Sequence, residues 1–455
     1  MAGRIMRSAG IAALLLTGLP ASASAQAVET AFSGPAIGPI PLEFILFGLV
    51  LVGVAVAHRH TMAIALTGAL GIALYKIMAS PFRTGAGFAG FGWHLEQEWV
   101  ILSNLLMLLV GFALLARHFE DSKVPAVLPK FLPDDWTGGL VLLGLIFVLS
   151  SFLDNIAAAL IGGAVAHTVY KGKVHIGYLA AIVAASNAGG AGSVVGDTTT
   201  TMMWIDGVRP IEVLHAYVGS VAAMAVVGIP ASILQQRYSP IQKDPPSGIR
   251  VDRTRVAVVA SILLAAVVMN VVINTRFTAI SDRFPFLGAA VWGALLVSAL
   301  RRKPEWTLLP GAFRSSVFLL SLVLCASMMP VERLPAASWH AALGLGFTSA
   351  VFDNIPLTAL ALKQGGYDWG VVAYAVGFGG SMIWFGSSAG VALSSMYPQG
   401  RSAGQWLRHG WFVSVGYVVG FFALIGILGF RPGTAPRGSE AASAAAVTAP
   451  ARAAE

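Results

Sequence analysis

The sequence predicts an all-α polytopic membrane protein with two inverted repeats, each containing a re-entrant helical hairpin and a broken transmembrane helix. Three observations support this fold class. Of the 455 residues, 56% are hydrophobic and only 11% are charged, whereas soluble domains carry about 25% charged residues. Glycine-rich polar motifs interrupt the apolar segments at two places, as in transporters built from repeats. Lysine and arginine gather at the ends of apolar segments, as the positive-inside rule expects.

Residues 1–25 are typical of a signal peptide. Arg4 and Arg7 give the positive start, residues 11–19 the short apolar core, and Ala23-Ser24-Ala25 the small-residue cleavage site. An uncleaved first span is the alternative. Cleavage would place the mature N-terminus on the periplasmic side of a bacterial inner membrane, and the order of the later spans places the C-terminal tail on the same side.

The N-terminal repeat is predicted over residues 26–235. Its ordinary spans are predicted at residues 36–57, 61–80, 97–116 and 211–234. The segment from Thr84 to Trp99 is rich in glycine and aromatic residues, which predicts a loop at the headgroup level. Glu43 and Glu98 lie near span ends, where a surface position is the expectation.

Two segments of this repeat do not fit ordinary spans. Residues 137–170 contain two short apolar stretches separated by Asp154-Asn155, and lysines lie outside both ends. This pattern predicts a hairpin that enters from the cytoplasm with its tip near mid-membrane. Residues 176–204 are apolar but are interrupted by clustered glycines at 187–196, which predicts a broken helix because glycine disfavours a continuous helix.

Residues 236–254 are predicted to form a cytoplasmic linker, and residues 255–430 repeat the plan. Ordinary spans of this C-terminal repeat are predicted at residues 255–274, 285–300, 307–329 and 410–430. The second hairpin, residues 336–362, has Asp353-Asn354 at its tip and is entered from outside, and residues 369–397 are the second broken helix. Residues 431–455 are rich in alanine, proline and glycine and are predicted to be a disordered tail.

Composition also limits the partners. The single cysteine, Cys325, excludes an intrachain disulfide and a cysteine metal cluster. The net charge of +8 does not indicate nucleic-acid binding, because the basic residues lie at span ends and form no stripe with interleaved aromatic residues. The expected partners are the lipid bilayer and a small inorganic cation, or an organic anion in the alternative below, and no cofactor is expected.

The candidate binding residues lie at the two tips and the two breaks. They are Asp154, Asn155, Asn187, Ser193, Asp197, Thr198, Asp353, Asn354, Thr358, Ser381 and Ser387. Broken helices direct dipoles and free carbonyls into the gap, and carboxylate, amide and hydroxyl oxygens suit Na⁺, Li⁺ or protons. The predicted Na⁺ ligands are Asp154, Asn155, Asp353 and Asn354. Neither motif contains an arginine or lysine that could hold an anion, so charge balance favours a cation as cargo.

Several candidates have simpler explanations. Asp154 and Asp353 could only cap the helices that follow them. Threonine hydroxyls after Asp197 could bond to helix carbonyls as readily as to an ion. His167 and His215 could sense pH, although an interfacial role is more common. Arg314 lies inside a span and needs either a carboxylate partner or access to the cytoplasmic surface, and the sequence leaves that choice open.

With these motifs identified, the chain resembles the ion transporter superfamily over about residues 36–430. The most specific parts are Phe352 through Thr358 and Gly379 through Gly390, which are similar to the second hairpin tip and broken helix of NhaD-type sodium/proton antiporters. Arsenite permeases and citrate and dicarboxylate carriers are related to them. The resemblance implies scaffold and transport domains, a homodimer, and elevator-like alternating access. Asp-Asn tips differ from the Ser-Asn-Thr tips of the carboxylate carriers.

Three functions remain open from the sequence. The first is a secondary transporter, not an enzyme, that exchanges Na⁺ or Li⁺ for H⁺ across the bacterial inner membrane. The second is a carrier of an organic anion such as citrate or a dicarboxylate, coupled to Na⁺ or H⁺. The third and most remote is an intramembrane aspartyl protease, which would need two aspartates that share a proton.

Overall fold

The computed structural model describes most of the chain between residues 34 and 433. The described residues are 34–57, 60–242, 248, 250–277, 280–281 and 283–433. The predicted signal peptide, part of the predicted linker and nearly all of the predicted tail lie outside the described residues.

Helices dominate the first half of the chain. A two-stranded antiparallel ribbon, β1 (Ala36–Ile37) and β2 (Ile40–Pro41), precedes them, with Ala36 opposite Pro41 and Ile37 opposite Ile40. The helices are α2 (Leu42–Val56), α3 (Thr61–Ala79), α4 (Gly87–Asp121), α5 (Val124–Val127), the 3₁₀ turn η2 (Leu128–Phe131), α6 (Trp136–Ser150), α7 (Asn155–Val169), α8 (Ile176–Ala191), α9 (Thr198–Ile205), α10 (Pro210–Leu214) and α11 (Ala216–Tyr238).

The second half is helical as well. Its elements are α12 (Arg253–Arg276), α13 (Phe286–Ala299), η4 (Trp306–Leu308), α14 (Leu309–Ser327), η5 (Val331–Arg333), α15 (Trp339–Ser349), α16 (Asn354–Gln364), α17 (Trp369–Gly379), α18 (Ser388–Met396), η6 (Pro398–Arg401), α19 (Ala403–His409) and α20 (Trp411–Leu428). Among the described residues, six helices are long and apolar enough to cross a membrane. The protein is therefore an all-α membrane protein.

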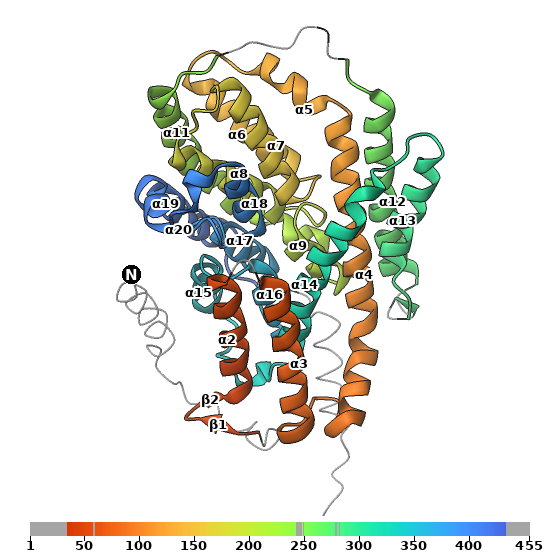
Figure 1. Cartoon of the computed structure of the whole chain (residues 1–455). Coiled ribbons are helices and arrows are strands. Elements are labelled where there is room, and N and C mark those ends of the chain that lie inside the picture. Colours follow the sequence, from red (N-terminus) through yellow and green to blue (C-terminus); the bar gives the residue numbers. More distant parts are fainter. Residues whose placement is uncertain are drawn as a thin grey trace, which may run out of the picture.

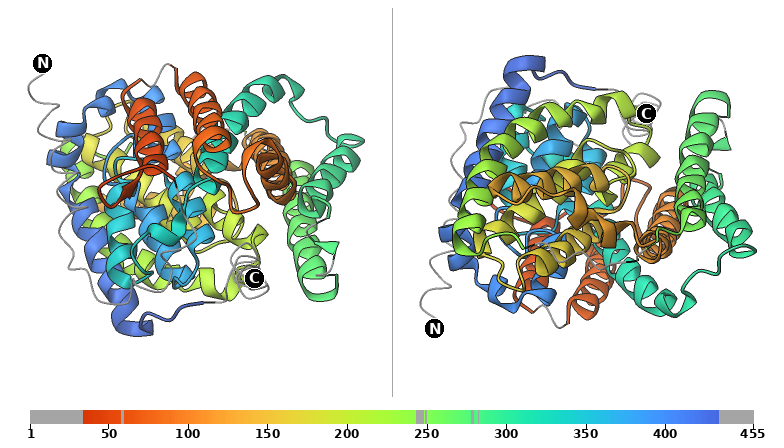
Figure 2. Two further views of the ribbon diagram at one scale, coloured as in Figure 1. Left: turned by 90° about the horizontal axis from the view of Figure 1, so that it is seen from below. Right: turned by 90° about the horizontal axis from the view of Figure 1, so that it is seen from above.

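The helices form a bundle around the short helices of the two polar motifs (Figure 1). Helix α11 packs against α20, α6 against α8, and α15 against α17. Helix α7 also contacts α18 and α16 contacts α9, so each Asp-Asn helix lies against a broken helix from the other half of the chain. The long helix α4 runs along one side of the bundle, and Figure 2 shows α12 and α13 beyond it, away from the polar motifs.

Three predicted boundaries are wrong. The first span was predicted from residue 36, but residues 36–41 form the β1–β2 ribbon and the helix begins at Leu42. The segment predicted as a loop at Thr84–Trp99 is helical from Gly87 onwards, as the start of α4. This glycine-rich turn packs closely: a Cβ added at Gly90 would lie 2.2 Å from the carbonyl oxygen of Gly85. Close packing against neighbouring backbone therefore outweighs the low helix propensity of glycine.

The first helix break is also shorter than predicted. Helix α8 continues to Ala191, and the irregular segment covers residues 192–197 rather than 187–196. Gly189 is helical, and a Cβ at this position would lie 2.0 Å from the carbonyl oxygen of Phe147 on α6. The first glycines of the motif thus allow two helices to approach closely, and only the later residues end the helix.

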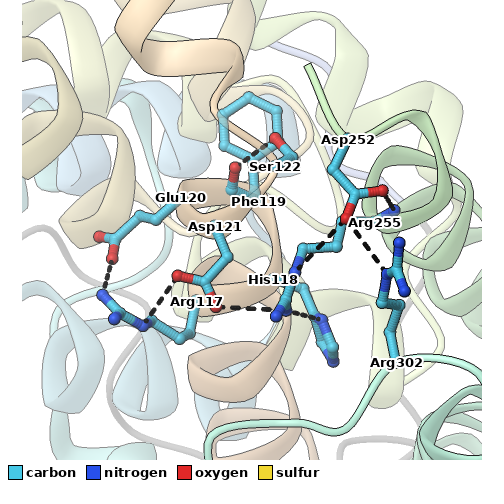
Figure 3. Close-up of polar contacts among 9 residues, drawn as sticks. All are labelled: Arg117, His118, Phe119, Glu120, Asp121, Ser122, Asp252, Arg255 and Arg302. Atoms are coloured by element: carbon cyan, nitrogen blue, oxygen red, sulfur yellow. Dashed lines mark hydrogen bonds and ion pairs between the residues drawn. The ribbon is translucent and has the colours of Figure 1, made fainter. Parts of the chain in front are cut away.

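One end of the bundle carries a charged cluster that joins three segments (Figure 3). Arg255 at the start of α12 lies 3.2 Å from Asp121 at the end of α4, and Arg302 after α13 lies 3.1 Å from Asp252. The backbone N–H of Asp252 also donates to the carbonyl oxygen of Ser122. Desolvation acts to raise the pKa of Asp252, but hydrogen bonds from Arg255 and Arg302 outweigh it, so the pKa lies below its usual value.

Candidate functional site

The two Asp-Asn tips have the same local geometry. Asp154 precedes α7 and accepts a hydrogen bond from the N–H of Ile156, while Asp353 precedes α16 and accepts one from the N–H of Ile355. Their φ and ψ angles are −53° and 141° for Asp154 and −54° and 142° for Asp353. Both aspartates are therefore N-caps, as the simpler explanation expected, and each places the following asparagine in the first helical turn.

The two helix breaks also match each other. Helix α8 ends at Ala191 and α9 begins after Asp197, whereas α17 ends at Gly379 and α18 begins after Ser387. Asp197 accepts from the N–H of Thr199, so it caps α9 as Ser387 caps α18. In both halves, the turn between the two short helices directs a capping oxygen toward the middle of the bundle.

Asp197 is the residue at which the two tips meet. Its Oδ2 accepts a hydrogen bond from Asn155 Nδ2 at 2.9 Å and another from Asn354 Nδ2 at 3.4 Å. Asp197 is only 2% exposed, and both asparagines are buried. One carboxylate thus receives amide groups from two helices that are far apart in the sequence, which helps to offset the cost of burying its charge.

Asn187 on α8 extends this network into the second half of the chain. Its Oδ1 accepts from Asn155 Nδ2 at 3.1 Å, and its Nδ2 donates to Ser381 Oγ at 3.0 Å and to Ser387 Oγ at 3.1 Å. Asn187 is fully buried. The first tip, both breaks and, through Asp197, the second tip are consequently joined by one continuous set of hydrogen bonds.

Asp353 lies beside this network and has one partner that the candidate set lacks. Ser388 Oγ donates to Asp353 Oδ2 at 3.1 Å, which connects the second tip to the second break. Ser388 stands directly after the cap of α18, and its place in the Gly386-Ser387-Ser388 motif was the sequence signal that could have identified it. Asp154 and Asp353 are both half-buried, in contrast to the enclosed Asp197.

The hydroxyls of three predicted residues form no hydrogen bond with the side chains of this network. Ser193 Oγ accepts from the N–H of Val195, two residues further on. Thr358 Oγ1 donates to the carbonyl oxygen of Asn354 within its own helix. Thr198 is the first residue of α9, and among the described contacts its hydroxyl forms no hydrogen bond with the network. The hydroxyls of Thr200 and Thr201 bond to the Asp197 carbonyl oxygen, so in these two the helix-bonding explanation is confirmed.

The charge of the site is uncompensated. Three carboxylates lie at or beside the network, and among the described residues no lysine, arginine or histidine forms a hydrogen bond or ion pair with any of its members. The oxygens of carboxylate, amide and hydroxyl groups are ligands for hard monovalent cations. The arrangement can therefore attract cations or protons, and among the described residues it has no basic side chain to hold an anion.

Two glutamates lie in the interior, contrary to the surface positions that were expected. Glu98 on α4 is 5% exposed and forms an ion pair of 2.5 Å with Lys363 at the end of α16. Glu43 is fully buried, 4.0 Å from Lys76, and accepts a hydrogen bond from Ser80. The sequence could not show either burial, because in each case the compensating partner is on another helix.

No family model matches the chain. The chain is 27% identical over 326 residues to sodium/proton antiporter 1 of Arabidopsis thaliana, which is 63% of this chain and 53% of that protein. It is 24% identical over 287 residues to sodium/proton antiporter 2 of the same plant, covering 55% of this chain and 67% of that protein. It is 27% identical over 317 residues to the Na(+)/H(+) antiporter NhaD of Vibrio parahaemolyticus, covering 58% and 74%.

The matched region thus spans about half the length of the first Arabidopsis relative. The three relatives come from a plant and a bacterium, and each is named as a sodium/proton antiporter. Six described helices of this chain are long and apolar enough to cross a membrane. The chain is similar to proteins named sodium/proton antiporters over 55–63% of its length.

Proposed function

We propose that this protein exchanges Na⁺, or Li⁺, for H⁺ across a bacterial inner membrane by alternating access. The observation that carries the proposal is Asp197, a buried carboxylate that accepts amide hydrogen bonds from both Asp-Asn tips. The similarity to proteins named as sodium/proton antiporters supports the same activity.

The chemistry of exchange follows from competition for the same oxygens. Asp154, Asp197 and Asp353 provide carboxylates, and Asn155 and Asn354 provide amide oxygens once an ion replaces their present hydrogen bonds. A carboxylate can hold either a proton or a sodium ion, but a bound proton removes the charge that holds the sodium ion. Binding of one ion therefore favours release of the other, which is the requirement for exchange.

The proposed architecture is the pair of inverted repeats with re-entrant hairpins, α6–α7 and α15–α16. The matching cap angles at the two tips and the matching breaks support it. The charged cluster of Figure 3 would lie on the cytoplasmic side, with the mature N-terminus and the C-terminal tail in the periplasm. The proposal includes a homodimer, as the resemblance to NhaD-type antiporters implies.

The other two functions receive less support. A carrier of an organic anion needs a basic side chain at the site, and Arg314 is exposed on α14 with no hydrogen bond to the described network. An aspartyl protease needs two carboxylates that share a proton, and among the described residues no hydrogen bond joins two of the three aspartates.

The experiment that tests the proposal uses the full chain in liposomes that contain a pH-sensitive dye and hold an imposed proton gradient. Na⁺, Li⁺, K⁺ and citrate are added in turn. Na⁺ or Li⁺ should dissipate the gradient, and K⁺ should not. Citrate uptake without a response to cations would overturn the proposal in favour of the anion carrier.

The variants Asp154→Asn and Asp353→Asn separate capping from transport, because asparagine caps a helix about as well as aspartate but carries no charge. We expect both variants to fold and to lose exchange. The matched control is Asp135→Asn, since Asp135 caps α6 in the same way but is exposed and far from the network. Normal exchange in both test variants would show that these aspartates only cap their helices.

A further inference from the structure

A groove of about 490 Å³ opens between the middle of α4, α13 and the first turns of α14. Its walls include Leu106 and Met107 of α4, Trp292 of α13, and Pro310 and Phe313 of α14. The indole N–H of Trp292 donates to the carbonyl oxygen of Met107 at 2.9 Å, which fixes the wall between α4 and α13. This volume lies within the range of about 300–1,000 Å³ that is usual for small-molecule sites.

The groove is lined by apolar side chains and lies in the part of the molecule that faces lipid. Phe313 at its edge is 52% exposed. If the groove were empty, the side chains that line it would lose dispersion contacts. In a bilayer, the apolar group available to fill the groove is a lipid acyl chain. Figure 2 shows that α13 lies beyond α4, on the outer side of the bundle and away from the candidate site.

Arg314 supplies a charge at this groove. It follows Phe313 and stands four residues after Pro310, so it lies on the same face of α14 as a residue that lines the groove. The side chain is exposed and forms no hydrogen bond or ion pair with another described residue. Helical side chains lean toward the N-terminus of their helix. The guanidinium of Arg314 is therefore directed toward the start of α14, on the side of the charged cluster of Figure 3.

The neighbouring basic residues differ from Arg314 in their partners. Arg117 lies 3.0 Å from Glu120, Arg255 pairs with Asp121, and Arg302 pairs with Asp252 (Figure 3). Arg314 has no such carboxylate among the described residues, although it lies about 8 Å along the helix from Leu309, inside a candidate span. An arginine inside a membrane span is costly unless its charge meets an anion, and among the described residues no carboxylate pairs with Arg314.

We propose that this groove and Arg314 form a binding site for one anionic phospholipid, with an acyl chain between α13 and α14, over α4, and the phosphate on the guanidinium of Arg314. Basic pockets between transmembrane helices on the cytoplasmic side bind phospholipid headgroups in this way. A guanidinium holds phosphate through two parallel hydrogen bonds. The exposed Arg301 and Lys303, which precede α14, add positive charge near the same mouth. The site is separate from the proposed ion path.

The test measures phospholipid bound to the full chain by native mass spectrometry after purification in mild detergent. Titration with phosphatidylglycerol should give a bound adduct and raise the melting temperature, and phosphatidylcholine with the same acyl chains should do so more weakly. In Arg314→Ala we expect about tenfold weaker binding of phosphatidylglycerol, as for the loss of one charge-assisted hydrogen bond. Arg276→Ala, at the opposite end of α12, is the matched control and should bind normally.

A second variant tests the groove itself. Leu106→Trp fills the hollow without changing any charge and should also weaken phosphatidylglycerol binding about tenfold, as burial of an acyl segment is lost. Unchanged binding in both Arg314→Ala and Leu106→Trp overturns the proposal. If Leu106→Trp instead converts a dimer to a monomer and leaves lipid binding intact, a second copy of the chain occupies the groove, and the proposal is equally overturned.

Discussion

The two broken helices of the protein share a backbone plan but differ in chemistry. Gly190 and Gly380 occupy matching positions, where an added Cβ would lie 2.7 Å from the carbonyl oxygen of Gly196 and 2.8 Å from that of Gly386. The caps that follow are a carboxylate, Asp197, in the first half and a hydroxyl, Ser387, in the second. The backbone of the break is therefore repeated, whereas a charged cap is present only in the first break.

The two broken helices also differ at the position of Asn187. This asparagine joins both breaks through its side-chain amide, while the second half has Gly377 near the matching position. An added Cβ at Gly377 would lie 3.1 Å from Cβ of Ala191 on α8, so a larger side chain has little room there. Of the two breaks, the first therefore supplies the carboxylate and the bridging amide, and the second supplies the space and the hydroxyls that Asn187 contacts.

The largest effect is expected from replacing the caps of the two breaks, Asp197 and Ser387. Asp197→Asn should abolish Na⁺-driven dissipation of a proton gradient in proteoliposomes, because it removes the enclosed charge but keeps a helix cap. Ser387→Ala should lower the rate only a few-fold, because Asn187 keeps its bond to Ser381. Equal loss in both variants would show that the two breaks contribute equally and that the carboxylate has no special role.

The second effect concerns an ion pair that only the second hairpin has. Lys363 at the end of α16 pairs with the buried Glu98 of α4, whereas α7 contains neither lysine nor glutamate. Removing one partner leaves the other charge buried, so Lys363→Met or Glu98→Leu should lower the free energy of unfolding by about 3–5 kcal/mol. The double variant Lys363→Met with Glu98→Leu should recover most of that loss in a thermal or denaturant melt. Additive losses would contradict a direct coupling.

Glycine substitutions sharpen the comparison of the two backbones. A Cβ at Gly196 would lie 2.1 Å from the carbonyl oxygen of Ser150, and one at Gly386 would lie 2.6 Å from that of Ala350. Both Gly→Ala variants should be destabilised by about 1–3 kcal/mol, with the larger loss at Gly196. Gly144→Ala on α6 is the control, because nothing lies within 4 Å of its added Cβ and alanine favours the helix. Melting temperatures of the purified variants would show whether Gly196→Ala is destabilised more than Gly386→Ala.

The smallest effect is a pH dependence confined to the first broken helix. His175 caps α8 through Nδ1, which accepts from the N–H of Gly177, whereas α17 is capped by the carboxylate of Asp368. Burial, and then the neighbouring His409, lower the pKa of His175 below its usual value of 6.5.

The unfolded chain therefore binds this proton more readily than the folded protein does. The stabilisation from neutral His175 is complete above about pH 6.5 and is lost as the pH falls toward the lower folded-state value. A melting series from pH 8 to pH 5 should show a modest decline that His175→Asn removes, since asparagine also caps but does not titrate. A decline of equal size in His175→Asn would assign the effect to other groups.

The sequence predicted the helical fold class and the positions of the polar motifs well, because apolar length and N-cap residues are local signals. It did not predict that α4 begins at Gly87, where Gly90 packs against the nearby backbone of Gly85. It could not predict that α8 continues through Gly189, since a close contact with the backbone of Phe147 on another helix decides this. Similarly, nothing local distinguishes Asp197, which the fold encloses, from Ser193 or Thr198, which it leaves outside the hydrogen-bonded network. The sequence alone does not show which remote segments lie close together, so it could not identify the members of the network.

The uncompensated carboxylates of the candidate site have an electrical consequence. Moving one elementary charge through a potential of 100 mV changes its energy by about 2.3 kcal/mol. Because no described lysine or arginine pairs with Asp154, Asp197 or Asp353, the net charge of the site is set only by the cations and protons bound there. The loaded and empty forms therefore respond differently to voltage, and in the proposed exchange the membrane potential would change the rates at which they move between the two faces of the membrane.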